Sequence, residues 1–186
     1  MVDLSRRATD PELLDEGVPE HEAARSLGDL RFVNRWLGGR RSLLAATLPH
    51  LGGSRPTLLD VGCGSADLPQ LLLRTVGARL LAVGVDLKLA HLRQAPADVK
   101  RVVADVRRLP FVPRSFDVVT ASLFLHHFDG GEVAEVLRTL YGLARRALVV
   151  NDLRRARVPY AFGRATFPWL FRSRVSVQDG LISIRR

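Results

Sequence analysis

Hydrophobic positions follow two different periods along the chain, and the change between them comes near residue 55. Before it, apolar residues recur at helical spacing over residues 20–37 and 40–51, and each stretch ends at a pair of glycines. After it, short apolar runs alternate with amphipathic stretches. The runs predict strands at residues 57–61, 80–86, 100–105, 116–122 and 146–152. The stretches between them predict helices at residues 66–76, 87–95 and 131–144.

The predicted strands lack polar alternation, which is typical of strands buried on both faces of a parallel sheet. Strands that alternate with helices predict an α/β fold, and right-handed crossovers make such a sheet doubly wound. Ligands of these folds bind beyond the carboxyl ends of the strands. We therefore expect a ligand site at the polar and glycine residues that lie at or just after those ends: Asp60, Gly62, Gly64, Asp86, Asp105 and Ser122.

A length of 186 residues suits one domain with a sizeable core. Residues 1–18 are polar and are expected to be loosely ordered, so that residues 19–186 form the domain and residues 55–155 its ligand-binding core. After the fifth predicted strand, residues 176–186 are enough for one more strand at most. The fifth strand would then be an open edge of the sheet.

Composition adds two expectations about partners and location. The formal net charge of +9 comes almost entirely from arginine, and such a balance can indicate nucleic acid or an anionic membrane. Because the arginines do not accompany a known nucleic-acid module, composition bias is the preferred explanation, and a nucleic-acid partner is not favoured. The single cysteine, the lack of a signal-peptide pattern and the lack of a membrane-spanning apolar run predict a cytoplasmic protein.

The stretch DVGCGSADLP, residues 60–69, decides which ligand the strand ends favour. A nicotinamide dinucleotide usually requires a third glycine at position 67, where this chain has Asp67. The carboxylate of Asp60 would also lie near its phosphates, which is unfavourable in a poorly solvated site. A phosphate-free, cationic nucleoside removes both objections, and S-adenosylmethionine is such a molecule. Asp86 could then accept hydrogen bonds from the ribose, and Asp105 could accept one from the adenine amino group.

These residues resemble the class I S-adenosylmethionine-dependent methyltransferases, which are Rossmann-like. DVGCGSADLP is similar to their first motif, GVDL at 84–87 to their ribose-binding acid, and residues 104–119 to their adenine-binding segment. The stretches FVNRWLGG, SLFLHHF and LVVNDLRR resemble a bacterial small-molecule subgroup. The resemblance implies methyl transfer to an oxygen or carbon atom of a phenolic, polyketide or quinone-like acceptor. It implies cofactor contacts from Asp60, Gly62, Cys63, Gly64, Asp86, Leu87, Asp105, Val106 and Ser122. Such proteins usually carry two further strands, so the carboxyl-terminal strands of this chain look missing or truncated.

Further side chains could take part in that chemistry, each with a structural alternative. His126 and His127 follow the fourth strand, where either could be a general base or could simply pack against its surroundings. Asn34 and Arg35 could close over the carboxylate of the cofactor, since arginine suits a bidentate grip, or they could lie on a solvated helix face. Cys63 has no basic neighbour in the sequence, so a small residue required by the turn explains it better than a nucleophile. No metal site is predicted.

Residues 154–175 mix arginines with five aromatic residues: Tyr160, Phe162, Phe167, Trp169 and Phe171. They could form a lid over a planar substrate, lie on a membrane surface, or pack as a helix broken at Pro168. Two other functions stay open beside small-molecule methylation. One is a non-catalytic or truncated module that binds S-adenosylmethionine, and the other is an RNA methyltransferase.

Overall fold

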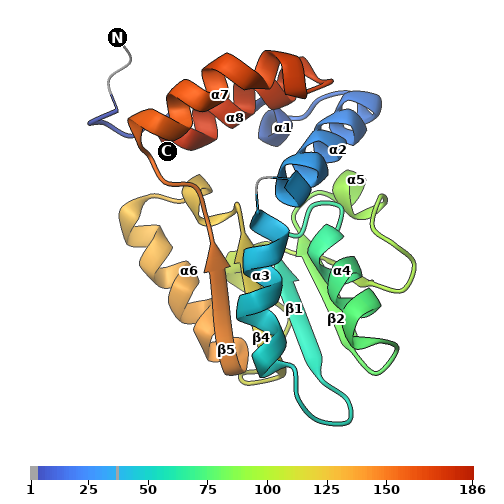
Figure 1. The fold of residues 1–186 in the computed structure, drawn as a ribbon. Coiled ribbons are helices and arrows are strands. Elements are labelled where there is room, and N and C mark those ends of the chain that lie inside the picture. The colour runs from blue at the N-terminus through green and yellow to red at the C-terminus, as the bar shows by residue number, and fades with distance from the viewer. Residues whose placement is uncertain (1–3, 37) are drawn as a thin grey trace.

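A computed structural model describes residues 4–36 and 38–186, and a five-stranded parallel sheet lies at its centre (Figure 1). The strands stand in the order β3-β2-β1-β4-β5, and every neighbouring pair is parallel. This order confirms the predicted doubly wound α/β fold. The strands are β1 Thr57–Val61, β2 Leu81–Asp86, β3 Lys100–Val103, β4 Phe116–Ser122 and β5 Ala144–Asn151.

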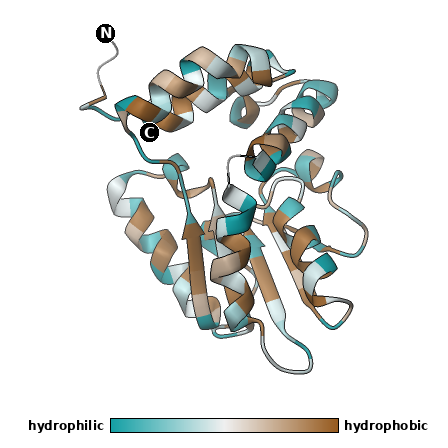
Figure 2. Cartoon of the chain, in the orientation of Figure 1, coloured by the Kyte–Doolittle hydropathy of each residue, from teal (hydrophilic) through white to brown (hydrophobic). Residues whose placement is uncertain are grey.

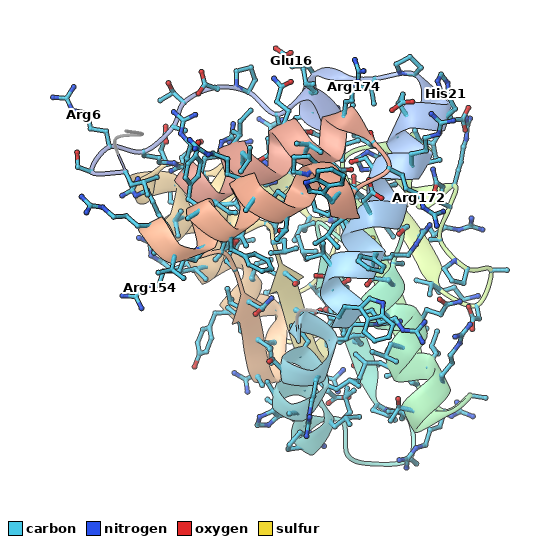
Figure 3. All side chains as sticks on the ribbon, turned by 45° about the horizontal axis from the view of Figure 1, so that its top comes forward. Arg6, Glu16, His21, Arg154, Arg172 and Arg174 are labelled. Carbon is cyan, nitrogen blue, oxygen red and sulfur yellow. The ribbon has the colours of Figure 1, made fainter. Side chains whose placement is uncertain are left out.

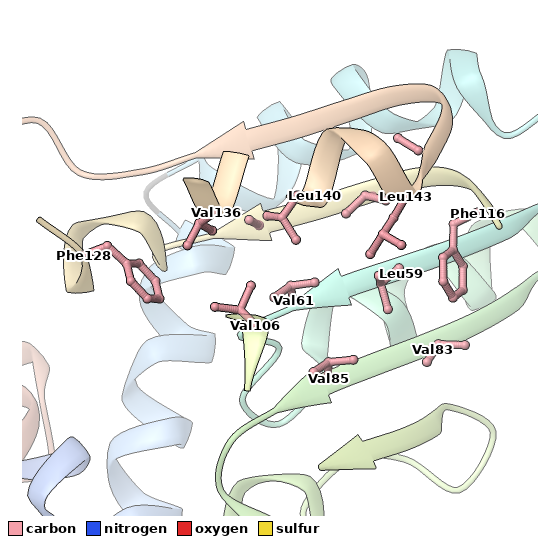
Figure 4. Close-up of a cluster of buried hydrophobic side chains, with 13 residues drawn as sticks. Leu59, Val61, Val83, Val85, Val106, Phe116, Phe128, Val136, Leu140 and Leu143 are labelled. Carbon is pink, nitrogen blue, oxygen red and sulfur yellow. The ribbon is translucent and has the colours of Figure 1, made fainter. Parts of the chain in front are cut away.

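Helices cover both faces of the sheet. Helix α6 (Gly130–Leu143) packs on one face, where its Val136, Leu140 and Leu143 meet the side chains of β1, β2 and β4 (Figure 4). Helices α3 (Gly39–Thr47) and α4 (Asp67–Val76) pack on the other face. The short helix α5 (Leu89–Leu92) follows β2. Strands that are apolar on both faces, brown in Figure 2, are therefore buried from two sides, as their composition predicted.

Four of the described helices lie above the carboxyl ends of the strands, and we call them the roof (Figure 1): α1 Leu13–Glu16, α2 Glu20–Trp36, α7 Arg157–Leu170 and α8 Arg174–Arg185. The connections within residues 4–36 and 38–186 contain three short 3-10 helices: η1 Leu48–His50, η2 Val106–Arg108 and η3 Leu125–His127. In the part of the chain that the structure describes, no helix is both long and apolar enough to span a bilayer.

The carboxyl-terminal part is helical where the sequence left room for at most one strand and for a helix broken at Pro168. Residues 176–186 do not form a strand, because α8 takes up almost all of them and buries residues at helical spacing, such as Val175, Asp179 and Ile182. Pro168 does not break α7, which continues to Leu170. The proline lies in the last turn of the helix, so the helix loses little beyond one backbone hydrogen bond. Strand β5 stands at an edge of the sheet, as predicted.

The amino-terminal segment also differs from its prediction within the described residues. Within residues 1–18, expected to be loosely ordered, residues 8–14 contact α8, for example through the hydrogen bond from Ala8 N–H to the Arg185 carbonyl (2.9 Å), and residues 1–3 lie outside the described residues. The carboxylate of Asp179 accepts hydrogen bonds from the backbone N–H groups of Leu13 (2.8 Å) and Leu14 (2.9 Å). The first N–H groups of any α-helix have no partner within the helix, and the N–H groups of Leu13 and Leu14 are such donors in α1. A distant residue therefore caps α1, which local sequence patterns do not reveal.

Candidate functional site

The turn between β1 and α4 has a conformation that its glycines make accessible. Gly62 and Gly64 both lie in the left-handed region, with φ of +65° and +54°. At Gly62 the lack of a side chain also matters for space, because a Cβ atom there would lie 2.2 Å from the ring of Phe124. The turn therefore brings its bare backbone close to whatever occupies the space above the strands.

Asp86, at the end of β2, holds this turn in place. Its Oδ2 accepts a hydrogen bond from the backbone N–H of Gly64 (2.9 Å), and its Oδ1 accepts one from Lys88 N–H (2.9 Å). His91 Nδ1 lies 3.3 Å from Oδ1. Because a carboxylate oxygen has two lone pairs, Oδ2 can still accept a second hydrogen bond. Asp86 thus ties two strand ends together and keeps an acceptor facing the site.

Asp60, at the end of β1, is buried with 4% of its surface exposed. The pKa of its carboxyl group is raised to about 7. Burial raises this pKa most, the nearby Asp67 and Asp86 raise it further, and the hydrogen bond from Thr120 Oγ1 (2.5 Å) lowers it. A group with this pKa exchanges its proton near neutral pH. Thr120 was not predicted as part of the site, although a polar residue inside an apolar strand could have indicated it.

A cavity of about 480 Å³ opens between the strand ends and the roof. Its floor is formed by the ends of β1 and β2, and its cover includes Leu27 of α2 and Phe167 of α7. The volume lies within the range of small-molecule pockets in proteins. Eight of the predicted site residues line it: Gly62, Gly64, Asp86, Leu87, Asp105, Val106, His126 and His127.

A smaller cavity of about 90 Å³ lies on the other side of the turn and shares Gly62 and Gly64 with the first. The remaining predicted residues of the turn and of β4, Asp60, Cys63 and Ser122, border it. Asn34, expected beside the carboxylate of the cofactor, borders it as well, together with Arg31 and Arg40, which the sequence did not indicate. The strand ends thus border two adjoining compartments, one large and one small.

The structure corrects the prediction for Arg35. Its side chain is exposed, stacks over the ring of Trp36 (5.5 Å to the centroid) and lines neither cavity. The reason is helical geometry, because one residue after Asn34 the helix has turned by about 100°. Arg31 and Arg40 border the small cavity instead. The Nε of Arg40 is buried and finds no hydrogen-bond partner among residues 4–36 and 38–186, so a donor is available there.

Cys63 is buried between the two glycines, and its role is packing. Burial raises the pKa of its thiol, and the carboxylates of Asp60 and Asp86 raise it further. A thiol held in its protonated form is a poor nucleophile. Its sulfur also occupies the space beside Gly84, where a Cβ would lie 2.8 Å from it.

Asp105 and Val106 follow β3 and begin η2. The Asp105 carboxylate accepts a hydrogen bond from Arg107 N–H (2.9 Å), which caps this short helix, while Val106 is buried at the cavity wall. Ser122 ends β4, where its hydroxyl accepts a hydrogen bond from Asn151 Nδ2 (3.3 Å). Both polar side chains therefore have structural partners and also border a cavity.

The ring of His126 has a carboxylate partner on each side, and the sequence predicted neither of them. Its Nδ1 lies 2.6 Å from Asp152 Oδ1, and its Nε2 lies 3.5 Å from Glu12 Oε1. Burial would lower the pKa of His126, but the hydrogen bonds and charges of Asp152 and Glu12 outweigh it and raise the pKa to about 9. An imidazolium has both nitrogens protonated and no lone pair to accept a proton, so this arrangement favours packing at His126 over the role of general base, the two alternatives that the sequence left open.

This arrangement predicts a pH-dependent stability. The folded-state pKa of His126, about 9, exceeds the ordinary value of 6.5, so its contribution is fully present below pH 6.5 and is lost as the pH rises through 9. A difference of this size corresponds to on the order of 3 kcal/mol. Chemical unfolding of the wild type and of His126→Gln should therefore show a gap in unfolding free energy at pH 6 that narrows by pH 10. A gap that stays constant over this range would contradict the assignment.

His127 stands differently in the same 3-10 helix. Its Nδ1 lies 2.9 Å from Asp15 Oδ2 and 3.3 Å from the guanidinium of Arg186. The carboxylate of Asp15 only accepts and the guanidinium only donates, and the shorter contact, to Asp15, favours the tautomer with the proton on Nδ1 and an acceptor at Nε2. Burial would raise the pKa of Asp15, but its hydrogen bond with His127 and the surrounding positive charges outweigh burial and lower that pKa. His127 is thus a histidine at the cavity wall, oriented by a carboxylate.

Glu12, His126 and His127 offer ligand atoms that lie within 4.8 Å of one another, close enough for a shared metal ion. The sequence predicted no metal site. In the structure the guanidinium of Arg186 lies 3.6 Å from Glu12 Oε1 and 3.3 Å from His127 Nδ1. A side-chain cation therefore already balances the charge of this cluster.

Comparison with known proteins places this geometry in context. A family model described as "Methyltransferase domain" matches residues 58–147. The demethylmenaquinone methyltransferase of Chlorobaculum tepidum is 27% identical over 133 residues, which cover 69% of this chain and 53% of that protein. The 2-phytyl-1,4-naphtoquinone methyltransferase of Thermosynechococcus vestitus is 30% identical over 93 residues, which cover 47% and 40%. The chain thus spans about half the length of the curated relatives it matches.

Solved structures share the fold at lower identity. The plantazolicin methyltransferase BpumL, determined in complex with SAH, matches with a TM-score of 0.66 and 14% identity, over 95% of this chain and 65% of that one. A putative methyltransferase from an antibiotic biosynthesis pathway of Anabaena variabilis matches with a TM-score of 0.52 and 20% identity, over 75% and 54%. At such identities the likeness supports the fold alone.

Proposed function

Because the chain belongs to the class I S-adenosylmethionine-dependent methyltransferases, we propose that it methylates a small organic acceptor with a phenolic or quinone-like ring. Two of the curated relatives that it matches are named as quinone methyltransferases, which supports a ring of this kind. The observation that carries the proposal is the set of three carboxylates, Asp60, Asp86 and Asp105, around a glycine turn at the strand ends. Such a site favours a cationic nucleoside over a phosphorylated one.

The two cavities fit the two halves of S-adenosylmethionine. Arg40 has a buried Nε without a partner in the described chain, which suits the carboxylate of the methionine half in the small cavity. Asp60 and Ser122 border the same cavity and would accept hydrogen bonds from the ammonium group. In the large cavity, the free lone pair of Asp86 Oδ2 would accept from the ribose. Asp105 and the backbone of Val106 would hold the adenine there, beside Leu87.

When bound, this cofactor supplies a methyl group that is already electrophilic. The task of the chain is then to hold the acceptor in line with that group, and positioning alone can lower a barrier by ~7 kcal/mol or more. We assign the removal of the acceptor's proton to His127, whose Nε2 is free to accept it while Asp15 holds Nδ1. His126, as an imidazolium, holds the η3 turn, to which it belongs, by binding Asp152 and Glu12.

A substrate panel tests the proposal. Purified protein would be incubated with radiolabelled S-adenosylmethionine and one of three acceptors: demethylated naphthoquinols, simple phenols or RNA. We expect label on a naphthoquinol or phenol. Binding of the cofactor without transfer to any acceptor would instead indicate a non-catalytic module, and label on RNA alone would indicate an RNA methyltransferase.

A matched pair of arginine substitutions tests the small cavity. Arg40→Met should weaken the binding of S-adenosylhomocysteine by roughly tenfold or more, because a hydrogen bond to a charged group contributes about 1.5–3 kcal/mol. Arg35→Met removes the same charge from the exposed face of α2 and should leave the affinity within about twofold, since surface substitutions of this kind rarely cost more than ~0.5 kcal/mol. Isothermal titration calorimetry measures both. Equal losses in the two variants would contradict the placement of Arg40.

A further inference from the structure

The outward face of α7 carries a row of exposed apolar side chains. Val158 is 79% exposed, Phe162 46% and Trp169 88%, and Ala165 between them is exposed as well. Successive spacings of four, three and four residues place all of them on one side of the helix. The opposite side buries Gly163 and Phe167. Helix α7 is therefore apolar on two sides, and within the described chain only the inner side is covered.

Positive charge surrounds this row. Residues 153–178 contain six arginines and no acidic residue. Arg154 lies near one end of the α7–α8 pair, while Arg172 and Arg174 lie near the other (Figure 3). Within residues 4–36 and 38–186, none of the six side chains forms an ion pair. The six are Arg154, Arg155, Arg157, Arg164, Arg172 and Arg174.

We propose that this face of α7 docks on the surface of an anionic phospholipid bilayer. A narrow apolar row that ends in a tryptophan suits the boundary between headgroups and acyl chains, and arginines beside it suit the negative headgroups. A second copy of the chain is a poor occupant, because two faces of the same strong positive charge would repel each other. Charge and apolarity together therefore select an anionic lipid surface.

Docking in this way has a consequence for the large cavity. The inner side of α7 contributes Phe167 to the cavity wall, so the same helix would separate the cavity from the lipid. If the acceptor is a lipophilic quinone, which rests on the proposed function, it would enter from the membrane along α7. The docking itself does not depend on that function, and it is tested without any turnover.

Vesicle binding tests the proposal with the full chain. The protein should float with vesicles of phosphatidylcholine and about one third phosphatidylglycerol, at least tenfold more than with phosphatidylcholine alone, and added salt should release it. The chain has two tryptophans, so Trp36→Phe leaves Trp169 as the single reporter. Its emission should shift to shorter wavelength on anionic vesicles and be quenched by brominated lipid. Equal flotation with both vesicles, or no flotation, would overturn the proposal.

Matched variants locate the contact. Phe162→Ser with Trp169→Ser should reduce vesicle binding at least tenfold, while Trp36→Ser, at a tryptophan 66% exposed on α2, should leave it unchanged. Arg157→Glu with Arg164→Glu should abolish binding, whereas the same charge change at the exposed Arg93 and Arg138 should reduce it by less than threefold. Circular dichroism confirms folding of each variant. Equal losses within either pair, or a wild type that self-associates through Trp169 and ignores vesicles, would refute the lipid contact.

Discussion

Asp86→Ala should weaken the binding of S-adenosylhomocysteine by roughly 100-fold or more, because it removes a charged acceptor at the point where β2 meets the glycine turn. Two losses combine in this variant. The ribose loses its acceptor, and the N–H of Gly64 loses the hydrogen bond that fixes the turn. Isothermal titration calorimetry of the folded variant measures the effect, and circular dichroism establishes that the sheet is intact.

Two further variants separate these losses. Asp86→Asn keeps one oxygen acceptor without the charge and should bind with an affinity between those of the wild type and the alanine variant. Asp98→Ala removes an exposed carboxylate from the loop between α5 and β3 and should bind like the wild type. If Asp86→Ala binds as tightly as the wild type, Asp86 is not the ribose acceptor. If the wild type itself gives no heat, the cofactor assignment fails.

His127→Gln should lower kcat for a phenolic acceptor by roughly 10²–10⁴-fold, the usual contribution of a general base. Glutamine can keep a hydrogen bond to Asp15 but cannot take up a proton, so the geometry of η3 is disturbed little. The affinity for S-adenosylhomocysteine should stay within about threefold, because the side chain acts on the acceptor and not on the cofactor. Methyl-transfer rates under saturating cofactor measure the first quantity, and calorimetry measures the second.

One histidine control and one carboxylate variant complete this experiment. His50→Gln replaces an exposed histidine of η1 and should retain full activity. Asp15→Asn should give an intermediate rate, because it removes the charge that orients His127. Unchanged kcat in His127→Gln would mean that the acceptor reaches the site already deprotonated, and the assignment of the base would be withdrawn.

Much of the fold follows from local features of the sequence. The bounds predicted for β1 and β4 agree with the structure, because each strand is a fully buried apolar run that ends at a glycine or polar residue. Helix α4 begins one residue later than predicted, and α6 begins and ends one residue earlier. The agreement is close because both helices alternate strongly between buried and exposed positions. Residues 87–95 were predicted as one helix, yet α5 covers only Leu89–Leu92. Such short segments depend on tertiary packing more than on propensity.

The candidate site also has residues that the sequence predicts and residues that it does not. The placement of Asp60, Gly62, Gly64 and Asp86 at the strand ends could be predicted, because they belong to two adjacent strands and one turn. The partners of His126 could not, since Glu12 and Asp152 reach it from segments far away in the sequence. The same is true of Arg40, which borders the small cavity only because α3 packs beside α4. A motif determines the chemistry of its own residues, whereas the charge around them is a property of the assembled fold.

The roof has buried apolar side chains of its own, separate from those that pack on the sheet. Its helices hold one another through apolar side chains such as Leu27, Phe167 and Ile184, yet none of them belongs to the buried clusters of the described sheet. Its contacts toward the sheet include polar ones, those of Glu12 with His126 and of Lys88 with the carbonyl groups of Leu14 and Asp15. We therefore expect the roof to open as a cooperative unit separate from the sheet. Amide protons of α1, α2, α7 and α8 will exchange together through a partial opening that leaves the strands protected, and a ligand between the units will slow that opening.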